Sequence, residues 1–219
     1  MSAQEHRLAV ARSGRYFTRG ARAPREVWFL CHGYGQLAAR FLEKFAVLDD
    51  GQRYLVAPEG LSRFYLSERP GERRVGASWM TREDRLAEIE DYVRYLDRVY
   101  DDVFGSLDRA QVSVHALGFS QGAATVSRWA ALGTARVDRV VLWGGELPPD
   151  LDLTRPSVVD RLRTARLTLV HGAADEYFTP KVVSGITARL DEHGISYRAV
   201  PFAGGHGLDD AVLRSLAST

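Results

Sequence analysis

Short apolar runs recur along the chain, separated by longer segments whose apolar residues repeat every three to four positions. Runs bounded by glycine, proline or polar residues predict buried strands at 27–31, 54–57, 112–117, 137–143, 167–171 and 197–202. Helices are predicted at 37–48, 81–103, 123–132, 181–193 and 209–216. The alternation of strands and helices predicts an α/β fold with a mostly parallel central sheet and helices on both faces.

The remaining segments carry weaker signals. Residues 7–19 alternate around Ser13-Gly14, which predicts a small β-hairpin. Thr81, with Asp84 three residues later, has the spacing of a helix capping box. Residues 59–80 contain an irregular stretch with prolines, glycines and arginines, and a loop this long in a compact domain is usually functional.

Composition narrows the possible classes of protein. The chain has 219 residues, is 45% hydrophobic and 26% charged, and carries a formal net charge of +1, so no charge excess favours a nucleic-acid partner. Cys31 is the one cysteine, which excludes an internal disulfide and fits a reducing compartment. No apolar run is long enough to span a bilayer and the first residues lack a signal-peptide core. We therefore expect a cytoplasmic protein without stable membrane insertion.

Residues 118–122 have the sequence G-F-S-Q-G and lie between a predicted strand and a predicted helix. A serine in a glycine-flanked turn of this kind is typical of a nucleophile elbow, because glycine relieves collisions and tolerates the strained backbone. Ser120 is therefore a candidate nucleophile. The alternative interpretation is a small-residue turn that only packs a helix closely onto a strand. A base and an orienting acid elsewhere in the chain would favour catalysis.

Three groups suited to a catalytic triad follow predicted strands in the order Ser120, Asp175, His206. The carboxyl ends of parallel strands meet at one sheet edge, where ligands bind in such folds. A serine hydroxyl needs an adjacent base, histidine serves near neutral pH, and an aspartate can orient the imidazole. This is also the order of the triad in α/β-hydrolases. Glu146 follows a strand at the same edge and is a rival to Asp175.

Two backbone N–H groups are candidates for an oxyanion hole, those of Gln121 and of Tyr34 in the H-G-Y-G turn after the first buried strand. Each such donor typically contributes about 3–4 kcal/mol of transition-state stabilisation. His32 in that turn is interpreted as structural. His115 is expected to be a hydrogen-bonded core residue, and His171 to have a supporting or core role.

Several motifs together resemble the small carboxylesterase/phospholipase family that includes the acyl-protein thioesterases. These are H-G-Y-G, G-F-S-Q-G, the turn at Asp175, Gly205-His206, and Ser78-Trp79 ahead of an amphipathic helix. The resemblance runs from about residue 27 to the C-terminus. The chain departs from the family pattern at Gln36, at Met80 and in the longer acid turn at 175–180.

The resemblance implies the α/β-hydrolase fold without a separate cap domain, and the absence of a linker indicates one domain over residues 1–219. It assigns the triad roles to Ser120, Asp175 and His206, and it implies hydrolysis of carboxylic esters or thioesters with no metal and no organic cofactor. The runner-up functions are a non-catalytic small-ligand binding protein on the same fold, and an acyltransferase or amidase using the same triad.

The expected partner is a small-molecule ester or thioester, and the expected assembly is a monomer or weak homodimer. The residues 59–80 are expected to form the substrate side of the site. Candidate substrate-binding residues are Phe64, Tyr65, Trp79, Met80, Glu146 and Leu147.

Overall fold

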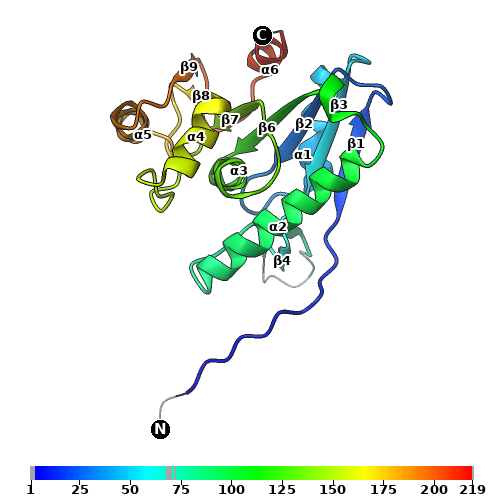
Figure 1. Ribbon diagram of the computed structural model, residues 1–219, viewed down its shortest axis with the longest axis vertical. Coiled ribbons are helices and arrows are strands. Elements are labelled where there is room, and N and C mark those ends of the chain that lie inside the picture. Colours follow the sequence, from blue (N-terminus) through cyan, green and yellow to red (C-terminus); the bar gives the residue numbers. More distant parts are fainter. Residues whose placement is uncertain (1–2, 68–70, 72, 219) are drawn as a thin grey trace.

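Seven strands form the central sheet of the computed structural model, which describes residues 3–67, 71 and 73–218. The spatial order is β1-β3-β2-β6-β7-β8-β9 (Figure 1). Every neighbouring pair is parallel except β1 and β3. The strands are β1 (Tyr16–Gly20), β2 (Glu26–Cys31), β3 (Arg53–Pro58), β6 (Ser113–Phe119), β7 (Arg139–Trp143), β8 (Arg166–Gly172) and β9 (Tyr197–Phe202).

Helices cover both faces of this sheet, because successive side chains of the strands point to opposite faces and both faces are apolar. The helices are α1 (Ala38–Glu43), α2 (Arg85–Phe104), α3 (Gln121–Leu132), α4 (Pro156–Thr164), α5 (Pro180–Glu192) and α6 (Asp210–Ala217), with short 3₁₀ turns η1 (Ala46–Leu48) and η2 (Arg109–Gln111). In β2, Val27 and Phe29 pack into the core layer under α2 and α3, whereas Trp28 and Leu30 pack into the layer under α1 and α6. The predicted α/β architecture is confirmed.

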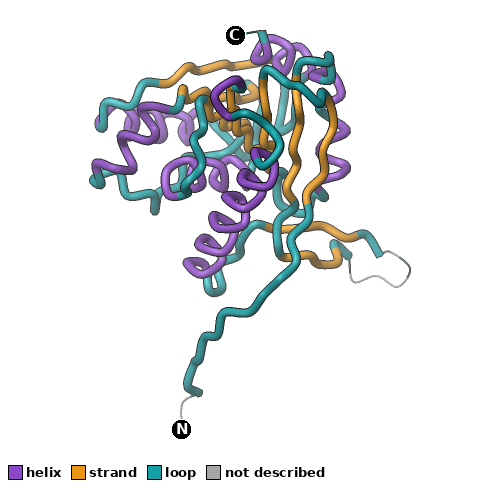
Figure 2. Tube along the Cα trace, turned by 45° about the vertical axis from the view of Figure 1, so that its right-hand side comes forward, coloured by secondary structure: helices purple, strands orange, loops and turns teal. Residues whose placement is uncertain are grey.

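The hairpin predicted at 7–19 is wrong. The chain before β1 is an extended segment that leaves the body of the molecule (Figures 1 and 2), and β1 pairs with β3 instead. Gly14 is there for close approach, since a Cβ at this position would lie 2.4 Å from the Tyr95 ring. The Tyr95 hydroxyl donates to the Arg15 carbonyl at 2.6 Å. Tertiary contacts, which the local pattern does not show, therefore hold residues 14 and 15 just before β1.

The start of α2 also differs from the prediction. The helix begins at Arg85, and the N-cap residue Asp84 has a left-handed backbone (φ 46°) with no capping hydrogen bond from its side chain. Thr81 instead binds Glu88, whose carboxylate accepts from the Thr81 N–H at 2.5 Å and from its hydroxyl at 3.1 Å. The proposed Thr81–Asp84 capping box is wrong because Glu88, one turn inside the helix, reaches back to Thr81.

Two further segments are more structured than the pattern indicated. The stretch expected to be irregular contains β4 (Ser62–Tyr65) and β5 (Val75–Ser78), an antiparallel pair separate from the central sheet (Figure 2). Part of that stretch, 68–70 and 72, lies outside the described residues. The helix predicted at 37–48 ends at Glu43 and resumes as η1, and α4 was not predicted. Within the described part of the chain, no helix combines the length and apolarity needed to cross a membrane.

Candidate active site

Ser120 occupies the turn between β6 and α3 with a strained backbone, φ 55° and ψ −117°. A left-handed φ is uncommon for a residue with a side chain, and such strain persists only where the surroundings impose it. The Ser120 N–H donates to the Trp143 carbonyl of β7 at 2.9 Å. The neighbouring strand thus holds the turn from one side.

Three glycines make this turn possible by letting backbone segments touch. A Cβ on Gly118 would lie 2.0 Å from the Gly122 carbonyl oxygen, and a Cβ on Gly122 would lie 2.1 Å from the Cys31 carbonyl oxygen. Gly145, after β7, is equally restricted, since its Cβ would lie 2.2 Å from the Ser120 carbonyl oxygen. Sequence reasoning did not identify Gly145; the signal was a glycine pair directly after a buried strand.

The Asp175 carboxylate and the His206 imidazole form a hydrogen-bonded pair. His206 Nδ1 donates to Asp175 Oδ2 at 2.8 Å. The Asp175 side chain is 1% exposed, whereas that of His206 is 22% exposed and accessible to a substrate. The loop that carries His206 is anchored by Trp143, whose indole N–H donates to the Gly207 carbonyl at 2.8 Å. Glu146, the rival acid, is exposed and forms no hydrogen bond or ion pair with His206 in the part of the chain that the structure describes.

Asp175 is held as a carboxylate by the turn that follows it. Its Oδ1 accepts hydrogen bonds from the Phe178 N–H at 2.8 Å and the Tyr177 N–H at 2.9 Å. Burial alone would raise the pKa of this carboxyl group, but these amides and His206 together lower it below its ordinary value. An ionised Asp175 keeps the proton on His206 Nδ1, which leaves Nε2 free to act as a base.

The imidazole lies beside the elbow. The ring centroids of Phe119 and His206 are 5.0 Å apart, and a Cβ on Gly144 would lie 3.3 Å from both His206 Nδ1 and Asp175 Oδ2. Among the described residues the Ser120 hydroxyl forms no hydrogen bond to His206. Catalytic hydrogen bonds are often long without substrate and shorten in the reacting complex, so the lack of a bond between Ser120 and His206 here is compatible with a base and its nucleophile.

Neither candidate oxyanion donor, the Tyr34 N–H or the Gln121 N–H, donates a hydrogen bond to any group in the described part of the chain. Gln121 is the first residue of α3, where N–H groups lack intrahelical acceptors and attract anions. Both amides are therefore available to an oxyanion.

The Tyr34 amide is oriented through His32. His32 Nδ1 donates to the Gly33 carbonyl at 2.8 Å, and its Nε2 accepts from the Gly60 N–H at 3.0 Å. Because C=O and N–H of one trans peptide point in opposite directions, holding the Gly33 carbonyl aims the Tyr34 N–H away from His32. Burial lowers the pKa of His32, against a smaller opposing effect of its bond to Gly33, and the neutral ring is the form this bonding requires.

The Gln121 side chain connects the elbow to residues 78–80. Its Oε1 accepts from the Trp79 N–H at 3.1 Å, and its Nε2 donates to the Met80 carbonyl at 2.8 Å. Trp79 in turn donates its indole N–H to the His32 carbonyl at 2.8 Å. Trp79 is 2% exposed, so its contacts are those of a structural bridge between the oxyanion turn and the elbow.

The other candidate substrate residues are distributed around the site. Leu147 is buried in the core, and half-buried Met80 packs against it, with its sulfur 3.6 Å from an Arg128 nitrogen. Tyr65 is exposed, and the half-buried Phe64 has its ring centroid 5.1 Å from that of Tyr34.

Two further histidines, His115 and His171, form no hydrogen bond with the Asp175–His206 pair in the described chain. His115 is buried and stacks on Trp28 with centroids 4.6 Å apart, but its Nδ1 has no partner among the described residues, contrary to the expected hydrogen bond. Burial lowers its pKa to about 4. The Nδ1 of His171 is also buried without a partner in the described chain.

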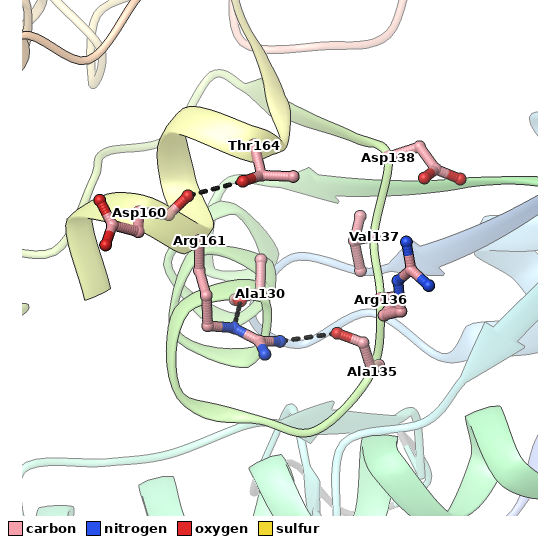
Figure 3. Close-up of a pocket in the computed structure, with 8 residues that line it drawn as sticks. All are labelled: Ala130, Ala135, Arg136, Val137, Asp138, Asp160, Arg161 and Thr164. Atoms are coloured by element: carbon pink, nitrogen blue, oxygen red, sulfur yellow. Dashed lines mark hydrogen bonds between the residues drawn. The ribbon is translucent and has the colours of Figure 1, made fainter. Parts of the chain in front are cut away.

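A pocket of about 200 Å³ lies at the end of the sheet away from Ser120, just before β7 begins (Figure 3). Arg161 crosses it and donates to the Ala130 carbonyl at 2.7 Å and the Ala135 carbonyl at 2.6 Å. The guanidinium group of Arg161 thus binds the protein's own backbone. The lining residues are Ala130, Ala135, Arg136, Val137, Asp138, Asp160, Arg161 and Thr164.

The fold is shared with solved structures of esterases. Acyl-protein thioesterase 2 from Zea mays matches with a TM-score of 0.70 and 18% identity, over 94% of this chain and 99% of that chain. A carboxylesterase from Mesorhizobium loti matches with a TM-score of 0.69 and 24% identity, over 94% of each chain. Esterase PE8 matches with a TM-score of 0.66 and 21% identity, over 94% of this chain and 96% of that chain.

Comparison by sequence found no matching protein-family model and no matching curated protein. At these identities the structural likeness shows the fold alone. The α/β-hydrolase fold expected from the sequence is confirmed over nearly the whole chain.

Proposed function

We propose that this protein is a serine hydrolase that cleaves carboxylic esters or thioesters through an acyl-enzyme on Ser120. His206 Nε2 accepts the hydroxyl proton as Ser120 Oγ attacks the carbonyl carbon. The Tyr34 and Gln121 amides stabilise the oxyanion that forms. Collapse of the intermediate breaks the bond to the alcohol or thiol, which leaves with the proton from His206.

Water completes the cycle. His206 takes a proton from a water molecule that attacks the acyl-enzyme, and the carboxylic acid leaves as Ser120 regains its proton from His206. One ester and one water give one acid and one alcohol or thiol. Asp175 stabilises the imidazolium formed in each half-reaction and does not itself exchange the proton.

The observation that carries this proposal is the 2.8 Å Asp175–His206 pair beside a strained serine and two amides without acceptors. A protein that only binds a ligand has no need of a strained serine backbone beside a hydrogen-bonded histidine–carboxylate pair. The names of the structural neighbours, which include thioesterase, carboxylesterase and esterase, support ester or thioester bonds as the target.

A fluorophosphonate probe tests the proposal, because it reacts covalently with an activated serine. We expect one adduct on the wild-type protein by intact mass, located on Ser120 by peptide mapping, and none on Ser120→Ala. Hydrolysis of aryl esters and of matched thioesters should depend on the same residue. An unlabelled wild type, or equal hydrolysis by Ser120→Ala, would contradict the proposal and favour a non-catalytic binding protein.

A further inference from the structure

Tyr177 exposes an aromatic ring beside the imidazole of His206. The two ring centroids are 5.0 Å apart with an interplanar angle of 58°, and Tyr177 is 76% exposed. Phe119, on the other hand, contacts His206 at the same centroid distance but is buried. Phe119 thus packs against the imidazole inside the protein, whereas Tyr177 borders the imidazole with most of its own surface exposed.

The side chain of Tyr177 does little for the fold itself. Its backbone N–H holds Asp175, a contact that any residue except proline could make. The next residue, Phe178, carries the hydrophobic anchor of the turn and is 4% exposed. The Tyr177 hydroxyl makes no hydrogen bond in the described part of the chain. The ring is therefore available for a ligand.

The chemistry identifies which part of a substrate would meet this ring. His206 returns its proton to the departing oxygen or sulfur, so the leaving group must lie next to the imidazole in the transition state. The carbonyl oxygen points instead toward the Tyr34 and Gln121 amides. A ring that borders the imidazole on its open side is therefore placed against the leaving group.

Resting on the proposed serine-hydrolase function, we propose that Tyr177 determines leaving-group specificity and selects esters whose alcohol part carries an aromatic ring. An exposed tyrosine offers a ring face and edge for stacked or edge-to-face contact, with little conformational freedom to lose. A saturated ring of similar size can bury apolar surface against Tyr177 but cannot make the aromatic pair.

Benzyl acetate and cyclohexylmethyl acetate form the test pair, because they share the acyl group and differ in whether the six-membered ring is aromatic. The readout is the ratio of their kcat/KM values. We expect the wild type to prefer the benzyl ester, and Tyr177→Ala to lower the ratio by about two- to tenfold, the range of an aromatic pair contact. Tyr177→Phe should keep the ratio.

Two further variants keep the test decisive. Tyr177→Leu retains an apolar side chain without a ring and should also lower the ratio, which decides the question if Tyr177→Ala unfolds. Leu132→Ala removes another exposed apolar side chain, at the end of α3 that lies away from Ser120, and should leave the ratio unchanged.

The failures of the two proposals are distinguishable. A wild type that hydrolyses both esters without preference, or an active Tyr177→Leu with an unchanged ratio, overturns the role of Tyr177 while the serine hydrolase stands. A wild type that neither reacts with fluorophosphonate nor hydrolyses either ester overturns the function on which that role rests.

Discussion

The two ends of the strands in the central sheet, here called its two edges, differ in what their polar groups do. At the edge where β7 begins, Asp138 accepts from Arg109 at 2.9 Å and from the Val114 N–H at 2.7 Å. Arg161 is occupied by backbone carbonyls, and the pocket of about 200 Å³ lies here. At the edge where β6 ends, a serine hydroxyl and two amides have no protein partner in the described chain.

The pocket and the proposed reactive site therefore differ in how many of their polar groups keep free hydrogen-bonding capacity. Ser120 and Gln121 are half-buried and Tyr34 is exposed, so these residues are accessible to a ligand. In the pocket, Arg161 already binds two backbone carbonyls and Asp138 binds Arg109 and the Val114 N–H, so these groups have fewer hydrogen bonds left for a ligand. At the opposite edge the candidate donors and the candidate nucleophile are available, in a turn held by glycines that admit no side chain.

The largest expected effect concerns the acid. Asp175→Asn should lower kcat about 10⁴-fold, as the corresponding change does in a serine protease, because the imidazole loses its required tautomer. Steady-state hydrolysis of an aryl ester measures it, with circular dichroism to show that the fold persists. Glu146→Gln is the matched control and should change kcat less than threefold. A damaging Glu146→Gln together with an active Asp175→Asn would reverse the assignment.

Gly145→Ala should abolish most activity and destabilise the protein by several kcal/mol, since the new Cβ would have to lie 2.2 Å from the Ser120 carbonyl oxygen. Urea unfolding and ester hydrolysis are the two measurements. Gly185→Ala, in α5, is the control, because a Cβ there meets no atom within 4 Å. This substitution should raise stability by about 0.5–1 kcal/mol and leave kcat unchanged.

At the other edge, Arg161→Gln should lower stability by about 1–3 kcal/mol, because two carbonyl groups lose a charged donor. Urea unfolding gives the loss, and kcat for an aryl ester should stay within twofold of the wild type. If Arg161→Gln lowered kcat and KM together, or lowered kcat as much as Asp175→Asn does, the pocket of Figure 3 would be coupled to the chemistry. The contrast between the two edges would then fail.

The smallest expected effect is a pH-dependent one at Glu59. Its side chain is fully buried, and the N–H of the next residue, Gly60, binds His32. Glu59 accepts from Arg15 at 2.7 Å and Arg63 at 3.3 Å. Burial on its own would raise the pKa of this carboxyl group, but the arginines outweigh burial and lower it. Its stabilisation is therefore present above the unfolded pKa of about 4.3 and is lost as pH falls through the lower folded pKa.

Glu59→Gln should accordingly cost about 1–2 kcal/mol at pH 7, with the difference from the wild type shrinking as the pH falls below about 4.3. Urea unfolding across pH 3–7 measures it. Arg94→Gln, which breaks exposed ion pairs on α2, should change stability by less than about 0.5 kcal/mol. A Glu59→Gln difference that grew on acidification would contradict the lowered pKa.

Sequence reasoning succeeded where local physics decides the structure. β2 reads as a continuous apolar run because both of its faces are buried, and the elbow is recognisable because Gly118 and Gly122 flank one serine between strand and helix. It failed where distant contacts override local preference. Gly14 suggested a turn but accommodates the Tyr95 ring, and Thr81 suggested a cap but binds Glu88.

The site shows the same division. Ser120, Asp175 and His206 could be named as candidates because each follows a strand, and strand ends of a parallel sheet share an edge. The pairing of His206 with Asp175 rather than Glu146 could not be read from local pattern. It depends on the adjacency of β8 and β9 and on the turn in which two amides bind the carboxylate.

Local sequence thus accounts for the alternating elements, the elbow and the set of candidate reactive side chains, because periodicity and glycine act over a few residues. The tertiary structure alone decided the third glycine of the elbow, the orientation of the Tyr34 amide through His32, and the exposed ring of Tyr177 beside His206. These features join residues from separate strands. Their distances are set by how the whole sheet packs, and that information is spread over the entire chain.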